Sequence, residues 1–169
     1  LLPHVNNSWW YETFRFYAAQ ADATPIVARC LQGNEPSVAQ LVLANNCAEE
    51  GLTLDKAVRE ELETILEAGL ESEDDSLRKL AAEVKLAHRL QNLFPISDTE
   101  AVDLDFITQA EYQLFLNENY SQSEYYQPDH WEGLEFPLGQ ANTPVVGVRP
   151  SDVSAFCQWL TNRSTHSER

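Results

Sequence analysis

The sequence predicts an α+β protein in two parts. An all-helical segment covers residues 1–94, a linker covers 95–103, and a mixed segment covers 104–169. In the first part, apolar residues recur with a period of about 3.6 in short blocks that end at glycine or proline, which is typical of helices. After Pro95 this period is lost. Short runs of β-branched residues and a long Tyr-, Gln- and Pro-rich stretch follow it, which indicates strands and a loop.

Five helices are expected in the first part, each bounded by residues that start or stop helices. The expected starting residues are Ser8, Thr24, Pro36, Asp55 and Ser72. The expected stopping residues are Gly33, Gly51, Gly69 and Pro95. Short helices joined by short turns are typical of a helical repeat of the solenoid type, and we expect such an array here.

The second part is expected to hold two short strands, at residues 104–107 and 144–148, because both runs are rich in β-branched and aromatic residues. The Thr-Gln-Ala-Glu sequence that begins at Thr108 matches a capping box and predicts a helix. Ser151 is expected to cap a last helix, and the polar tail from Thr161 is expected to fray.

The spacing of aromatic residues in these two helices predicts one shared core. Tyr112 and Phe115 are three residues apart and therefore lie on one helical face, as do Phe156 and Trp159. Both faces need cover from the strands. The residues expected in this core are Phe106, Tyr112, Phe115, Val146, Phe156 and Trp159.

Composition limits the possible partners. The formal net charge is −16, with only 11 Lys and Arg, which argues against binding nucleic acid or an anionic membrane surface. No apolar run is long enough to span a bilayer. The three cysteines have no close partner in sequence, and we expect small buried side chains in a reducing, cytoplasmic compartment. Because the chain begins at Leu1 and has no methionine, we expect it to begin inside a longer protein.

Several blocks of the second part match one family in order, spacing and chemistry. These blocks are residues 106–115, 128–131, 143–148 and 151–160. Over about residues 103–163 the chain resembles the N-terminal third of the formylglycine-generating enzyme (sulfatase-modifying factor) family. The resemblance implies the family fold, a variant of the C-type lectin fold.

The resemblance does not carry the family's activity to this chain. The family's Leu-Pro-Thr-Glu-Ala-Glu-Trp-like run does not follow Leu160, and the later cysteines of its copper-dependent oxidation are absent from the sequence. Cys157 matches a structural cysteine of the family, whereas Arg149 and Pro150 stand where the family usually has Ser-Trp. We therefore expect no catalytic residue, no metal and no cofactor. The alternative is a truncated oxidase that modifies a substrate cysteine.

The first part resembles a different class of protein. Residues 1–5, 8–13, 17–20 and 43–50 are similar to the helical region that follows the nucleotide-binding domain in NACHT-type (STAND) signalling ATPases. No phosphate-binding loop of the GxxxxGK[ST] type is present, so this chain itself is not expected to bind ATP. Some bacterial proteins join such an ATPase to a formylglycine-enzyme-like tail that binds ligands, and in some a retroelement diversifies the tail. The remainder of such a polypeptide is then a partner of this segment.

The candidate ligand-binding residues lie in the long loop of the second part: Tyr125, Tyr126, Asp129, His130 and Trp131. Asp and His side chains serve as metal ligands or acid–base pairs, but neighbouring loop residues rarely face one site. The aromatic residues either form a binding surface or pack beneath the loop. Asp129, His130 and Trp131 either anchor the loop structurally, which is the more common role, or contact a ligand. As ligand-binding residues, the five candidates are expected to recognise a neutral or basic protein.

Overall fold

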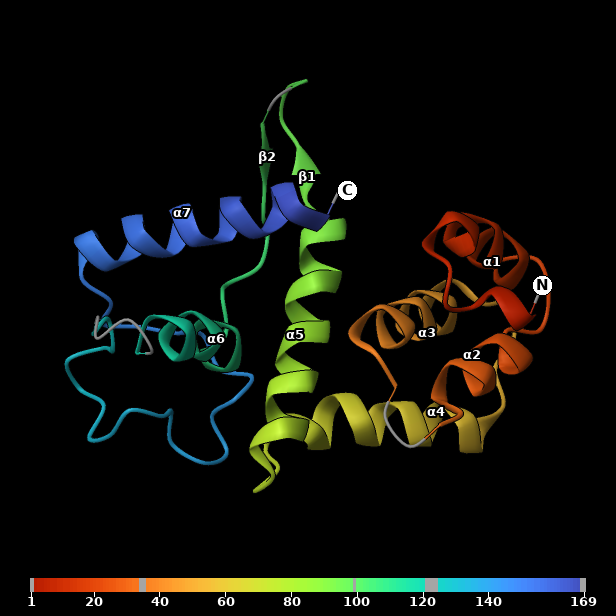
Figure 1. Ribbon diagram of the computed structural model, residues 1–169, viewed down its shortest axis with the longest axis horizontal. Helices are drawn as coiled ribbons and strands as arrows, with labels where there is room; N and C mark the ends of the chain where they lie inside the picture. Colours follow the sequence, from red (N-terminus) through yellow and green to blue (C-terminus); the bar gives the residue numbers. More distant parts are fainter. Residues whose placement is uncertain (1, 34–35, 99, 121–124, 168–169) are drawn as a thin grey trace. The chain divides into compact units, whose positions relative to one another are not determined.

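The computed structural model of the protein shows a helix-rich fold with one small two-stranded sheet among the residues that it describes (Figure 1). The described residues are 2–33, 36–98, 100–120 and 125–167. The chain forms two compact units, Leu1–His88 (unit 1) and Arg89–Arg169 (unit 2). Their boundary lies inside helix α5. No helix of the described residues combines the length and the apolar composition needed to cross a membrane.

Unit 1 is made of short helices that follow one another along the chain. In order, these are 3-10 turns at Leu2–His4 and Ser8–Trp10, α1 (Tyr11–Ala18), α2 (Thr24–Leu31), α3 (Val38–Glu50), α4 (Lys56–Glu63), a π-helical turn at Thr64–Ala68, and α5 (Asp75–Gln91). Helix α5 continues past His88 into unit 2. The five predicted helices are therefore present.

The helix starts agree with the sequence in part. The Asp55 carboxylate accepts hydrogen bonds from the backbone amides of Ala57 and Val58, as an N-cap does. Elsewhere the cap lies one or two residues from the predicted residue. Thr24 lies inside α2, the cap of α3 is Ser37 and not Pro36, and Asp74 caps α5 in place of Ser72, which lies two residues before it.

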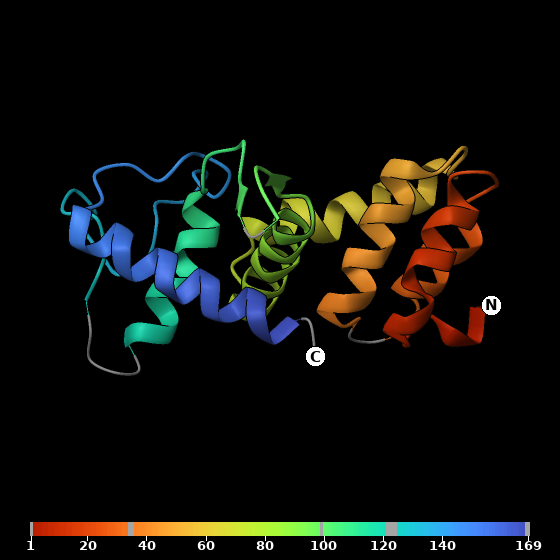
Figure 2. The same ribbon diagram turned by 90° about the horizontal axis from the view of Figure 1, so that it is seen from above.

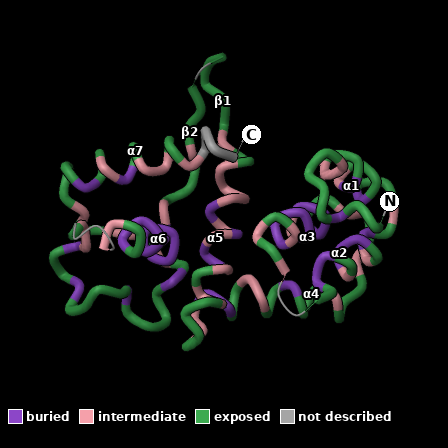
Figure 3. The backbone as a smooth tube through the Cα atoms, viewed as in Figure 1, coloured by how far each residue is buried: buried purple, intermediate pink, exposed green. Residues whose placement is uncertain are grey.

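The core of unit 1 lies between helices α1, α2 and α3, to which α5 adds Val84 (Figure 3). Phe14 on α1 and Leu41 on α3 are fully buried. Cys30 and Cys47 belong to the same core, as predicted, and burial raises the pKa of each thiol to about 12. A thiol with so high a pKa is almost never a thiolate at neutral pH, so these two cysteines are structural.

Unit 2 contains α6 (Gln109–Tyr120), α7 (Pro150–Ser167) and a small antiparallel sheet. The sheet pairs β1 (Phe94–Pro95) with β2 (Ala101–Val102), so the predicted linker folds back as a short hairpin. Helix α7 lies across α6 in both views (Figures 1 and 2). Trp159 of α7 donates a hydrogen bond of 2.6 Å to Glu118 of α6, which fixes this crossing.

The two predicted strands of unit 2 are wrong in extent. Segments 104–107 and 144–148 meet only through an isolated bridge between Thr108 and Pro144 and a hydrogen bond of 2.9 Å from the Val145 amide to the Ile107 carbonyl. Two features explain why the hydrogen-bonded ladder between these segments is not longer. The Arg89 guanidinium donates hydrogen bonds to the backbone carbonyls of residues 105 and 106, which occupies these acceptors. Gly147 has a positive φ of 69°, which bends the other segment.

Four of the six predicted core residues do form one aromatic cluster. Phe115 lies 5.4–5.6 Å, between ring centroids, from Tyr112, Phe156 and Trp159. The other two predictions are wrong, since Phe106 is 80% exposed and Val146 is 60% exposed. Both belong to the bent segments, which turn these side chains away from the cluster.

Three predictions for α7 also need correction. Ser151 does not cap the helix, because α7 already begins at Pro150, and its hydroxyl donates to Asp152 instead. The helix continues past Thr161 to Ser167 rather than fraying. Cys157 is exposed and not buried, and it borders a pocket.

The three cysteines should therefore differ in reactivity. A maleimide added to the native chain at neutral pH is expected to modify Cys157 quickly, because that thiol alone is exposed. Cys30 and Cys47 should react only after unfolding, because burial both hides them and raises their pKa. Mass spectrometry of the labelled peptides measures the order of modification. Equal labelling of all three cysteines in the native chain would contradict the burial of α2 and α3.

Candidate functional site

The candidate site lies on the loop between α6 and α7, of which residues 125–149 are described. Helix α6 is suited to holding this loop because its first eight residues, Gln109 to Leu116, are all buried. Polar side chains among them must therefore find partners inside the protein. Much of that hydrogen bonding is directed to the loop.

Gln113 is the main loop anchor. Its amide nitrogen donates to the Leu134 carbonyl at 3.0 Å, and its amide oxygen accepts from the Phe136 backbone at 3.2 Å. Tyr112 adds a hydrogen bond of 2.9 Å from its hydroxyl to the Tyr126 carbonyl. At the start of α6, backbone amides donate to the carbonyls of loop residues 141 and 143. The loop has no helix or strand in its described part, yet its backbone is fixed at several points.

Two of the five candidate residues contribute to this anchoring. Trp131 is only 8% exposed and packs edge-on against Phe136. Tyr126 is half-buried and lies 5.0 Å from the Phe115 ring, measured between centroids. Tyr125, by contrast, is 63% exposed. Trp131 and Tyr126 therefore pack beneath the loop, whereas the side chain of Tyr125 is exposed to solvent.

Asp129 forms an ion pair with Arg149, the residue just before α7. The hydrogen bonds from Arg149 lower the pKa of the Asp129 carboxyl and keep it charged. Together with Tyr125, Gln127, Pro128 and Trp131, these two residues line a small pocket of about 190 Å³. The structure therefore brings Tyr125, Asp129 and Trp131 together in one pocket.

Arg149 was absent from the residues selected by sequence. The chain separation of 20 residues between Arg149 and Asp129 hides their pairing. One sequence feature drew attention to Arg149 itself: Arg149 and Pro150 occupy positions where the resembled family has Ser-Trp. A charged residue in such a position marks a local change in surface chemistry.

His130 lies outside this pocket and against Gly147. A Cβ added to Gly147 would lie 2.8 Å from the His130 Nδ1 atom, which is too close for contact without movement. Gly147 also has a φ of 69°, which side chains other than glycine rarely adopt. His130 thus packs against the segment before α7. Among the described residues, no three His, Cys, Asp or Glu side chains lie together as metal ligands.

Replacing Gly147 with alanine should move His130. We expect a strain cost of about 1 kcal/mol from the positive φ, together with displacement of the imidazole ring. The change in ring position can be followed by NMR of the His130 side chain. Gly139→Ala is the matched control, because Gly139 has a φ of 78° and nothing near its Cβ position, so it adds strain without moving His130. Unchanged His130 signals in Gly147→Ala would contradict the described packing.

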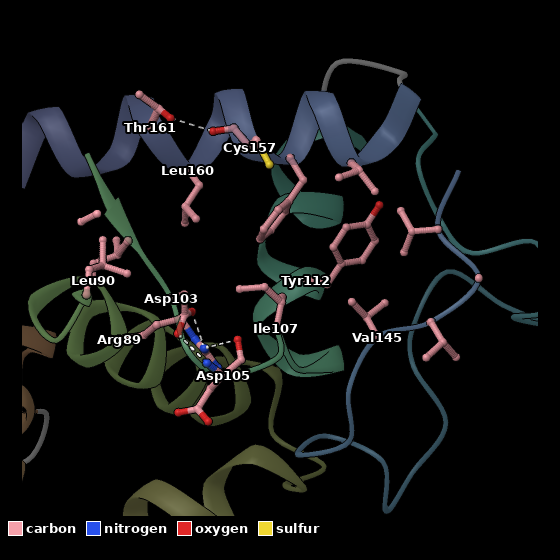
Figure 4. A pocket seen from close by; sticks show the side chains of 17 residues that line it. Arg89, Leu90, Asp103, Asp105, Ile107, Tyr112, Val145, Cys157, Leu160 and Thr161 are labelled. Carbon is pink, nitrogen blue, oxygen red and sulfur yellow. Dashed lines mark hydrogen bonds and ion pairs between the residues drawn. The ribbon is translucent and has the colours of Figure 1, made fainter. Parts of the chain in front are cut away.

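A second and larger pocket of about 630 Å³ lies elsewhere in unit 2 (Figure 4). Its walls come from the end of α5, from β2, from residues 103–107 and 145–148, and from α7. Most of the lining is aliphatic or aromatic, and Figure 4 shows Ile107, Val145, Leu160 and Tyr112 around the space. Its size lies in the range typical of ligand sites.

The polar end of this larger pocket is built on Arg89. Its guanidinium donates to both oxygens of Glu111, at 2.7 and 3.0 Å, and to Asp103 at 2.5 Å. Burial alone would lower the pKa of Arg89, but the hydrogen bonds to Glu111 and Asp103 outweigh this and raise it. Glu111 is fully buried and also forms the predicted capping box with Thr108. The capping-box prediction is therefore confirmed, and Arg89 extends it into an ion cluster.

These arrangements suit non-covalent binding. The loop pocket offers an aromatic ring beside an exposed ion pair, and the larger pocket offers apolar walls beside a buried ion cluster. Arg89 and Thr108 both donate hydrogen bonds to Glu111, and these three residues stabilise the start of α6. No family model, no curated protein and no solved structure matches this chain.

Proposed function

We propose that the chain is the non-catalytic recognition region of a larger signalling ATPase. In this proposal, unit 2 is the N-terminal part of a formylglycine-generating-enzyme-like domain of C-type lectin fold and binds a protein ligand. The helical unit 1 transmits the binding event to a nucleotide-binding domain of the same polypeptide. The sequence blocks described above support both assignments, and the anchored loop supports the binding role.

The single observation that carries the proposal is that the loop is held firmly while its outer side chains are exposed. Gln113, Trp131 and Phe136 fix the loop from within. Tyr125, Leu134 and Leu138 are 63%, 52% and 74% exposed on the same loop. A scaffold of this kind can change its contact residues without losing its core, which is the usual basis of loop-mediated recognition. An exposed aromatic residue near an arginine is also typical of interface hot spots.

The charge of the chain indicates the kind of ligand. With a net charge of −16, the chain repels other polyanions and attracts neutral or basic proteins. The exposed Asp129–Arg149 pair offers both a hydrogen-bond acceptor and a donor to such a ligand. We therefore favour a protein surface with mixed polar and apolar groups as the ligand, and neither nucleic acid nor a membrane.

Helix α5 is the element suited to transmission, since residues of both units belong to it. Val84 contributes to the core of unit 1, with Leu80 and Ala87 packed against that core. Arg89 on the same helix binds Glu111 and Asp103 of unit 2. A change at the start of α6 would reach α5 through the Arg89 ion cluster.

The test uses the full-length protein and its ATP hydrolysis. Purified full-length protein is mixed with ATP and with fractions of lysate from its own host cell. A version that ends before Asp103 is assayed in parallel. We expect at least one fraction to stimulate hydrolysis by the full-length protein and not by the shortened version. Equal stimulation of both versions would show that unit 2 is not the sensor.

The alternative is a truncated oxidase, for which the exposed thiol of Cys157 is the relevant observation. That thiol sits on α7 beside aliphatic side chains and has no second cysteine near it among the described residues. We expect no conversion of cysteine to formylglycine when the purified chain is supplied with copper and a cysteine-containing substrate peptide. Formation of the aldehyde, detected by mass spectrometry, would favour the oxidase over the recognition role.

A further inference from the structure

The larger pocket of unit 2 has the properties of a second docking site. It shares no lining residue with the loop pocket that contains Tyr125 and Asp129. Aliphatic residues of three segments converge on it, including Leu93 after α5, Ile107 before α6, and Leu160 on α7. At about 630 Å³, it holds several apolar side chains.

The apolar surface does not end at the rim of the pocket. Val146 and Val153, which line it, are 60% and 47% exposed. Leu104 and Phe106 alternate in sequence with the lining residues Asp103, Asp105 and Ile107, and they do not line the pocket themselves. Exposed apolar side chains at the rim favour a protein partner, because an isolated small molecule would fill the pocket and leave Val146 and Val153 in water.

The polar end of the pocket is negatively charged. Among the residues that line the pocket, Arg89 supplies one positive charge and Asp103 and Asp105 supply two carboxylates, so one negative charge remains. Glu111 and Asp103 are bound to Arg89, and Asp105 is exposed at the rim. A cationic side chain that enters the pocket could therefore form an ion pair with the Asp105 carboxylate.

We propose that this pocket docks an apolar segment of a partner protein that carries one lysine or arginine. The apolar side chains of the segment fill the space between Ile107 and Leu160 and cover Val146 and Val153. The basic side chain pairs with Asp105. This site is additional to the loop surface proposed above and does not depend on it.

Cys157 provides a reporter for the proposal. It lines the pocket (Figure 4) and is exposed. Cys30 and Cys47 are buried. A bound segment should therefore slow the reaction of Cys157 with a maleimide, without altering the other two thiols. The rate of labelling measures occupancy of the pocket directly.

The experiment selects ligands from a phage-displayed library of random peptides, with the whole chain as bait. The proposal predicts that peptides which slow Cys157 labelling are enriched in apolar residues and contain Lys or Arg. Asp105→Asn should weaken these peptides about fivefold, as expected for one partly exposed ion pair. Val153→Asp should weaken them more than tenfold, because it places a charge against the apolar wall. Leu52→Asp, at a 69% exposed leucine of unit 1, is the matched control and should leave binding unchanged.

Other occupants give different results, and each overturns the proposal. If the chain at high concentration protects its own Cys157 without peptide, the occupant is a second copy. If dodecylammonium protects Cys157 as well as the selected peptides do, the site binds small amphiphiles. Selected peptides that leave the labelling rate unchanged, or that are acidic, exclude docking of a basic apolar segment.

Discussion

Replacing Arg89 with alanine is expected to destabilise unit 2 by about 3–5 kcal/mol, since it removes one partner of a buried ion pair. The side chain of Glu111 has no exposed area, and that of Arg89 is 11% exposed. Without Arg89, the Glu111 carboxylate stays buried and keeps the hydrogen bonds that the backbone amide and hydroxyl of Thr108 donate to it. Hydrogen exchange of the α6 amides measures the loss in unit 2 specifically.

The control and the rescue variant sharpen this test. Lys56→Ala removes a pair on α4 whose lysine is 88% exposed, and it should cost no more than about 0.5 kcal/mol. Adding Glu111→Gln to Arg89→Ala should restore part of the loss, because glutamine keeps the capping box and removes the buried charge. Exchange in α6 that is as slow in Arg89→Ala as in the unchanged protein would refute the central place of this ion cluster.

Phe115→Ala is expected to cost about 3–5 kcal/mol of the stability of unit 2. Phe115 is only 1% exposed, and its ring contacts four other aromatic rings, those of Tyr112, Tyr126, Phe156 and Trp159. Its loss opens a cavity at the crossing of α6 and α7 and removes the support of the loop at Tyr126. Chemical denaturation, followed by hydrogen exchange of α6 and α7, measures the effect.

Phe16→Ala is the matched control for this variant. Phe16 is also a phenylalanine on a helix, but it is 73% exposed on α1. Its truncation should change the free energy of unfolding by less than about 0.5 kcal/mol. If the two variants were equally stable, the aromatic cluster would not be the core of unit 2.

Local patterns predicted the helices well because helix starts depend on nearby residues. Asp55 caps α4, and Thr108 with Glu111 forms the capping box of α6, each within three residues of chain. The aromatic pairs on α6 and α7 were predictable for the same reason, since residues three apart share a face. Burial of Cys30 and Cys47 followed from their apolar helical surroundings.

The errors occurred where distant residues decide the backbone. Segment 104–107 has the composition of a strand. However, Arg89 donates hydrogen bonds to two of its backbone carbonyls, which lie 16 and 17 residues away in sequence. Segment 144–148 bends at Gly147, where the sequence suggests only a glycine between valines. The Asp129–Arg149 pair also depends on tertiary structure, because the loop must fold back before those residues meet. Patterns of neighbouring residues contain no information about such contacts.

The affinity of a protein ligand for single-residue variants of the loop tests the central claim most directly. Host protein fragments displayed on yeast are selected for binding to the whole chain, and the dissociation constant of each is measured by calorimetry. Tyr125→Ala and Arg149→Ala should each weaken binding at least about tenfold, as expected for hot-spot residues. Tyr17→Ala, which removes a 46% exposed tyrosine from α1, should leave the affinity unchanged. Equal affinity for the three variants and the unchanged chain would contradict recognition by this loop.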